Sequence, residues 1–254
     1  MIFDTHAHYN DSAFEEDREE LLTGMKDRGI GRIVNVAADI RSLDEVTELA
    51  ERYSFCYAAV GIHPEDCALM TEETLEAIRR KLRLEKTVAV GEIGLDYHYD
   101  EPERELQQYW FRKQLELAAR EKAPVIIHSR DAAEDTYEIL REFADSLEGG
   151  VIHCFSYSRE LALDAVRMGF YIGVGGVVTY KNGRKLKEVV QAIPLERIVL
   201  ETDCPYLSPA PHRGERNHSG NLPLVIAEIA ALKEIPEEEV VTVTERNAEK
   251  LYRL

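Results

Sequence analysis

The sequence lacks the features that mark several large classes of protein. Its 254 residues include only four cysteines, Cys56, Cys67, Cys154 and Cys204, and no two of them have CxxC spacing. Scattered cysteines favour free thiols in a reducing compartment over a disulfide framework or a structural zinc site. No apolar run approaches the roughly 20 residues that cross a bilayer, and no basic segment precedes an apolar signal core. We therefore expect a cytoplasmic protein without a membrane partner.

Positive charge is also scarce. The chain has 31 Lys and Arg against 48 Asp and Glu, a formal net charge of -17. Such a surface counts against general binding to nucleic acid, although an enzyme needs positive charge only where its substrate sits. No Ser/Gly/Pro-rich linker, charge block or low-complexity tract divides the chain. We therefore expect a single domain over residues 1–254, and nothing in the sequence indicates an obligate protein partner.

Eight short apolar runs alternate with longer amphipathic segments. The runs cover residues 2–5, 32–37, 55–60, 87–90, 124–127, 151–152, 170–174 and 197–200. Helical spacing predicts helices over 14–28, 43–53, 72–83, 103–122, 132–147, 159–168, 184–192 and 222–233, with a C-terminal helix over 236–254.

This alternation predicts a parallel sheet with both faces covered by helices. Eight strand and helix units favour a closed (β/α)8 TIM barrel of the α/β class, with the C-terminal helix packed on it. Periodicity alone leaves an open doubly wound sheet as an alternative, but no GxGxxG follows the first run to support one.

Residues able to bind metal stand at the ends of six of these runs. The segments are Asp4-Thr-His-Ala-His8, Gly61-Ile-His-Pro64, Gly91-Glu-Ile-Gly-Leu-Asp96, His128-Ser-Arg-Asp131, His153-Cys-Phe-Ser156 and Glu201-Thr-Asp-Cys-Pro205. Most of the eight histidines fall in these segments. Since the active site of such a barrel lies at the carboxyl ends of its strands, we expect these side chains to meet.

The donor types predict the chemistry. His6 and His8 are two residues apart, so in an extended strand their rings point to the same side. Imidazoles with carboxylates suit zinc, manganese or a related divalent ion, whereas magnesium favours oxygen ligands. The donors exceed the roughly three protein ligands of one catalytic zinc. Two ions about 3.5 to 4 Å apart, activating a water between them, are more natural, with Glu92 as the bridge.

These motifs resemble the TatD family of metal-dependent deoxyribonucleases, within the amidohydrolase-like metal-dependent hydrolases, over the whole length. The resemblance implies that His6, His8, Glu92 and Asp203 surround one ion and that Glu92, His128 and His153 hold the second. It also implies hydrolysis of phosphodiester bonds in DNA, commonly from the 3′ end, and at abasic sites in some members. Tyr157 stands where the family often has Gly, which bears on the choice of substrate.

Several residues beside the predicted ligands have two readings. Asp203 is expected to be a ligand or general base rather than a helix N-cap. His63 is expected to donate to a substrate phosphate. Arg130 suits a bidentate phosphate contact, with an ion pair to Asp131 as the alternative. Asp96 is expected to anchor its loop or orient an imidazole.

Other residues remain more open. Glu201 either orients a ligand or bonds to backbone. A cationic loop is as consistent with solvation as with DNA contact; it contains His212, Arg213 and Arg216. Tyrosines near strand ends could stack bases, which would reduce the need for a basic surface; they are Tyr97, Tyr99, Tyr157 and Tyr206.

Two rival functions remain at this point. One is a small-molecule hydrolase for esters, amides or phosphotriesters, or a deacylase for D-aminoacyl-tRNA, on the same barrel. Enzymes of that type often bridge their metals with a carboxylated lysine, and no Lys ends a run here. The other rival is a binding protein that kept the scaffold without turnover.

Overall fold

The computed structural model describes all 254 residues, and its centre is one parallel sheet of eight strands in sequential order. The strands are β1 (Ile2–Ala7), β2 (Ile30–Val36), β3 (Cys56–Val60), β4 (Thr87–Asp96), β5 (Val125–Arg130), β6 (Gly150–Ile152), β7 (Tyr171–Val174) and β8 (Ile198–Leu200).

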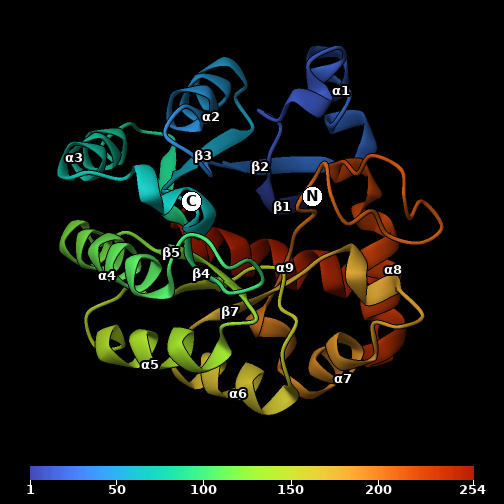
Figure 1. Cartoon of the computed structure of the whole chain (residues 1–254). Coiled ribbons are helices and arrows are strands. Elements are labelled where there is room, and N and C mark those ends of the chain that lie inside the picture. Colours follow the sequence, from blue (N-terminus) through green and yellow to red (C-terminus); the bar gives the residue numbers. More distant parts are fainter.

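Helices surround the strands (Figure 1). They are α1 (Arg18–Thr23), α2 (Ser42–Arg52), α3 (Glu72–Lys81), α4 (Arg104–Glu121), α5 (Ala133–Phe143), α6 (Arg159–Arg167), α7 (Arg184–Ala192), α8 (Leu222–Lys233) and α9 (Glu237–Tyr252). Short 3-10 turns cover Ser12–Phe14, Lys26–Arg28, Pro64–Leu69, Gly176–Thr179, Leu195–Arg197 and Ser219–Asn221. None of the helices is both long and apolar enough to cross a bilayer.

The sheet closes where the chain after β8 meets β1. The amides of Thr202 and Asp203 donate to the His6 carbonyl at 3.3 and 3.0 Å, and the His8 amide donates to the Cys204 carbonyl at 2.8 Å. The predicted (β/α)8 TIM barrel is confirmed. Closure also places the first and last predicted ligand segments side by side, although about 200 residues separate them in the chain.

The C-terminal helix α9 packs against the strands, as predicted, and crosses them in the view of Figure 1. Ala248, Leu251 and Tyr252 of α9 share an apolar cluster with strand residues such as Phe3 and Val199. The Tyr252 hydroxyl also donates to the Thr5 carbonyl at 2.9 Å. This packing stabilises β1 and β8, the two strands that close the barrel.

Two predicted elements differ from the structure. The helix expected over 14–28 is only six residues long, α1, between two 3-10 turns, because Gly24 caps it and Gly29 turns the chain at φ 81°. Strand β4 continues past Val90 to Asp96, so that Glu92 lies inside the strand. Gly94, at φ 151°, permits this extension, since a Cβ there would lie 1.9 Å from the His128 carbonyl oxygen on β5.

Candidate metal centre

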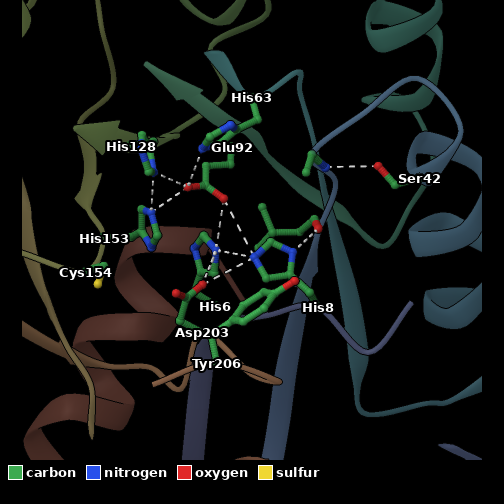
Figure 2. Close-up of polar contacts among 12 residues, drawn as sticks. His6, His8, Ser42, His63, Glu92, His128, His153, Cys154, Asp203 and Tyr206 are labelled. Atoms are coloured by element: carbon green, nitrogen blue, oxygen red, sulfur yellow. Dashed lines mark hydrogen bonds and ion pairs between the residues drawn. The ribbon is translucent and has the colours of Figure 1, made fainter. Parts of the chain in front are cut away.

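Six predicted ligands converge at the carboxyl-terminal rim of the barrel (Figure 2). Their side chains come from β1 and the residue after it, β4, β5, the residue after β6 and the loop after β8; they are His6, His8, Glu92, His128, His153 and Asp203. The barrel places them there because parallel strands end at a common rim.

One half of this cluster is built by β1 and the loop after β8. The Nε2 atoms of His6 and His8 lie 3.0 Å apart, so the two rings do converge from positions i and i+2. The Oδ1 atom of Asp203 lies 3.6 Å from His6 Nε2 and 3.4 Å from His8 Nε2. Ligand atoms on one tetrahedral zinc lie about 3.3 Å apart, given bonds of about 2.0 to 2.1 Å. These three donors therefore fit one ion.

The other half is built by β4, β5 and the end of β6. His128 Nδ1 and His153 Nε2 lie 3.3 Å apart, and Glu92 Oε1 lies 2.8 and 2.5 Å from them. The second oxygen of Glu92, Oε2, faces the other half, 3.3 Å from His6 Nε2. One carboxylate thus presents a separate oxygen to each half of the cluster.

The clustered side chains shift one another's pKa. Burial disfavours the Glu92 carboxylate, but the imidazoles of His153 and His6 hold its pKa well below the usual range. Burial opposes protonation of His8, yet Asp203 and Glu92 raise its pKa to about 9. The pKa of His6 falls to about 4, because the ring is buried and lies beside His153. Without metal, a proton on His8 supplies the positive charge that offsets the carboxylates of Asp203 and Glu92.

The geometry of His63 makes it a hydrogen-bond donor. Its Nδ1 accepts the Glu65 amide at 3.2 Å, and its Nε2 lies 3.8 Å from Glu92 Oε1. Burial and the charge of His128 lower its pKa to about 3, so the ring is neutral with its one proton on Nε2. His63 is close enough to Glu92 and His128 to share an ion. Binding a metal through Nε2 would move the ring proton to Nδ1, however, and Nδ1 could then no longer accept the Glu65 amide.

Asp96 orients an imidazole, which was one of its two expected roles. Its Oδ2 lies 2.9 Å from His128 Nε2, and its Oδ1 accepts the His98 amide at 2.9 Å. Since a carboxylate only accepts, Nε2 carries the proton and Nδ1 is left to face the centre. Asp96 therefore fixes which His128 nitrogen is available to a metal.

The role of Asp4 was not predicted from the sequence. Its carboxylate accepts hydrogen bonds from the Thr202 hydroxyl at 2.7 Å and the Ser219 hydroxyl at 2.6 Å, and burial raises its pKa to about 6. These bonds join β1 to the loops after β8 and thereby hold His6 beside Asp203. The available signal was its position at the start of the Asp4-Thr-His motif.

A cleft of about 1110 Å³ opens in front of the cluster. Arg130 lines it and is exposed, with its guanidinium 5.6 Å from the centre of the Tyr99 ring. The alternative ion pair with Asp131 is wrong, because that carboxylate contacts His98 at 3.1 Å instead. Tyr206 also lines the cleft and is exposed. These three side chains are available to a substrate.

The other predicted substrate contacts are already engaged. Arg216 pairs with Asp17 at 2.5 Å, and Arg213 stacks on Tyr180 at 4.5 Å. His212 lies 2.8 Å from Glu215. Of the four tyrosines, Tyr97 donates to Asp135 at 2.6 Å, and the Tyr157 hydroxyl lies 2.8 Å from the Ser129 hydroxyl and also accepts the Ala132 amide at 3.2 Å.

Residues 3–253 match the family model described as TatD related DNase. This chain belongs to the TatD family. It is 45% identical, over the full length of both chains, to the uncharacterized metal-dependent hydrolase YabD of Bacillus subtilis. It is 32% identical to the 3'-5' ssDNA/RNA exonuclease TatD of Citrobacter rodentium, over 99% of this chain and 97% of the relative.

The solved structures agree. The Escherichia coli TatD homologue YjjV superposes with a TM-score of 0.94 at 34% identity, covering 100% of this chain and 98% of YjjV. The TatD resemblance stated from the motifs is confirmed, and the protein is a metal-dependent hydrolase.

Proposed function

We propose that this TatD-family hydrolase removes nucleotides from the 3′ end of single-stranded or damaged DNA, with two divalent ions held on either side of Glu92. The observation that carries the proposal is the division of that carboxylate, Oε1 toward His128 and His153 and Oε2 toward His6. Zinc, magnesium or manganese would be bound by two sets that share Glu92: His6, His8 and Asp203 on one side, and His128 and His153 on the other.

The residues fit this cofactor. Four imidazole nitrogens and two carboxylates meet at one point, and each half matches the donor types that divalent transition ions prefer. The ions, when bound, would supply Lewis acidity to a water and to a phosphoryl oxygen. Glu92 remains ionised in this setting because the surrounding imidazoles hold its pKa low.

The side chains around the centre supply the remaining steps. Asp203 is placed to take the proton of the attacking water as the new oxygen–phosphorus bond forms, and to return a proton to the departing ester oxygen. His63 Nε2–H and Arg130 are placed to donate to the phosphoryl oxygens as their charge grows. Each of these three residues lines the cleft.

The cleft supports action at a strand end rather than along a long duplex. Of its four arginines, Arg18 donates to backbone carbonyls, Arg41 and Arg52 lie 3.7 and 2.8 Å from glutamates, and Arg130 has no carboxylate partner. Arg130 alone can neutralise one phosphate, which is what the end of a strand requires, whereas a long duplex would require several such contacts. Tyr99 and Tyr206 offer exposed rings on which terminal bases would stack. The name of the Citrobacter relative includes RNA, so RNA ends belong to the same proposal.

The acidic wall of the same cleft favours a second candidate. Asp39, Glu65 and Asp66 line it, and burial together with neighbouring carboxylates raises the pKa of Glu65 and Asp66. Such a wall attracts a positive group, for example the α-ammonium of an aminoacyl ester. A D-aminoacyl-tRNA deacylase, or a hydrolase of small esters or amides, is the alternative.

Parallel assays separate these candidates. Single-stranded DNA and RNA labelled at either end, an abasic duplex, mischarged tRNA and a small ester are incubated with the protein loaded with zinc, manganese or magnesium. We expect loss of label first from the 3′ end. Preferential deacylation of the tRNA would overturn the nuclease assignment.

The bridging role has its own variant. Glu92→Gln removes one anionic oxygen, and we expect turnover of single-stranded DNA to fall by at least about a thousandfold, because both halves lose a shared ligand. Glu138→Gln, the same change at an exposed position on α5, is the matched control. Undiminished turnover by Glu92→Gln would remove the bridging role.

A further inference from the structure

The four imidazoles of the centre differ in how the nitrogen turned away from it is held. His8 Nδ1 lies 2.9 Å from the Val36 carbonyl, and His128 Nε2 lies 2.9 Å from Asp96. The Nδ1 atoms of His6 and His153 are buried and have no partner. A metal-binding imidazole generally donates its other N–H to an acceptor, and a buried donor without one is costly. Two of the four rings therefore need an acceptor.

An unused acceptor close to both rings is Glu201, which follows β8 and is 1% exposed. Its Oε1 accepts the Cys154 amide at 2.5 Å, whereas its Oε2 is buried with no partner. Gly173 on β7 makes room for this carboxylate, since a Cβ there would lie 2.3 Å from Oε2. Glu201 is thus anchored through one oxygen and unsatisfied at the other, and its carboxylate lies close to both histidines.

The spacing of the three groups suits a water molecule better than a metal. A ring nitrogen of His6, one of His153 and a carboxylate oxygen of Glu201 all lie within 4.8 Å of one another, while no ring nitrogen lies within 4.0 Å of a Glu201 oxygen. Ligands on one tetrahedral ion would be about 3.3 Å apart. Atoms up to 4.8 Å apart can each lie about 2.8 Å from a shared point, the length of a hydrogen bond to water.

We propose that Glu201 is a positioning residue that holds the His6 and His153 rings through one buried water molecule. The water accepts the two Nδ1–H groups and donates to Glu201 Oε2, so that all three unpartnered atoms are satisfied. Both rings are then fixed in the tautomer whose Nε2 lone pair faces the centre. The rings are stacked with centroids 4.0 Å apart, so one water can serve both.

The substitution Glu201→Gln tests this balance without changing volume. If the amide oxygen stays on Cys154, the amide NH₂ adds a third donor to a water that can accept two. We expect zinc affinity, measured by competition with a chelator, to weaken ten- to a hundredfold. In NMR spectra of the zinc-loaded, ¹⁵N-histidine-labelled protein, we expect the protected Nδ1–H signals of His6 and His153 to be lost.

Two further variants keep the test decisive. Gly173→Ala displaces the carboxyl group without replacing it, and we expect the same NMR change. Glu138→Gln, the same change at an exposed position on α5, is the matched control and should leave zinc affinity and both Nδ1–H signals unchanged.

The proposal is overturned if folded Glu201→Gln and Gly173→Ala keep both signals and bind zinc within twofold of the parent. A crystal structure of the zinc-loaded protein in which Glu201 contacts the rings directly, with no water between them, would also overturn it. The inference rests on the proposed metal ligands. Nuclease activity enters none of these measurements, so a failure of the substrate proposal is distinguishable from a failure of this one.

Discussion

The imidazole cluster has two sides, and a buried glutamate stands on each. On the cleft side, Glu92 is 3% exposed and contacts several imidazoles, which hold its pKa well below the usual range. On the barrel side, Glu201 is 1% exposed, and in the metal-free protein burial raises its pKa to about 8 because its one direct donor is a backbone amide. Burial is the same, so the neighbouring charges decide the difference.

This comparison teaches that one cluster divides two tasks. The cleft side concentrates ionised groups that can exchange protons and bind ions, and it opens to the substrate. The barrel side offers acceptors that fix ring orientation. Changes on the cleft side should therefore lower turnover even at saturating metal, whereas changes behind the rings should lower metal affinity with little effect on turnover at saturating metal.

The largest expected effect is on kcat, in a variant of Asp203 on the cleft side. Asp203→Asn on the cleft side keeps the shape of the side chain but removes the base, so we expect kcat to fall about 10²- to 10⁴-fold, with a smaller change in KM. Single-turnover cleavage of end-labelled DNA at saturating metal measures this. A fall in metal affinity that accounts for the whole loss would contradict the division.

The second-largest expected effect concerns Asp96, which contacts His128 Nε2. Asp96→Asn replaces the acceptor of its Nε2–H, and we expect zinc affinity to weaken about 10- to 100-fold while kcat at saturating zinc changes little. Chelator competition and a zinc titration of activity give both values. Full affinity in this variant would show that the His128 tautomer is fixed without Asp96.

A smaller effect concerns pH. The neighbouring carboxylates raise the pKa of His8 and of His128 to about 9, against burial, so both rings are protonated at pH 7 without metal. Metal must displace these protons. We expect zinc affinity to rise from pH 7 to 9 by up to about tenfold per unit for each proton displaced, and to level off above pH 9.

Calorimetry in two buffers with different ionisation enthalpies would measure the number of protons released. An affinity that is constant between pH 7 and 9, with no proton release, would contradict the protonated state of the two rings.

The smallest expected effect is at the edge of the cleft. Tyr206→Ala removes an exposed ring, and we expect KM for single-stranded DNA to rise about fivefold or more with kcat nearly unchanged, because stacking contributes about 1 kcal/mol or more per base. Tyr109→Phe, an exposed position on α4 away from the cleft, serves as the control. An equal KM for the Ala variant would exclude this residue from base binding.

Much of the barrel and the centre could be predicted from the sequence, because the signals are local. Apolar runs alternate with helical spacing, and ligand-type residues follow the runs, as in Gly61-Ile-His-Pro64. The predictions failed where glycine geometry decided the outcome. Gly29, at φ 81°, turns the chain where the first helix was expected to end, and Gly94 lets β4 continue beside β5.

Contacts between distant side chains could not be predicted. The loop cations looked available in the sequence, but Arg216 pairs with Asp17, almost 200 residues away. The position of Asp4 in its motif did not indicate that Ser219 would be its partner across the closure of the barrel. Such partners depend on which loops meet, and neither periodicity nor motif spacing contains that information.

The sequence by itself determined the alternation of eight strands with helices, the donor types and the rim at which they gather, because the alternation fixes where each strand ends. Only the tertiary structure decided which oxygen of Glu92 faces which histidines, which nitrogen of each ring faces the centre, and which cations remain available. Those outcomes depend on distances of a few ångströms between segments far apart in the chain, where burial and neighbouring charge set the free energy of each proton and each hydrogen bond.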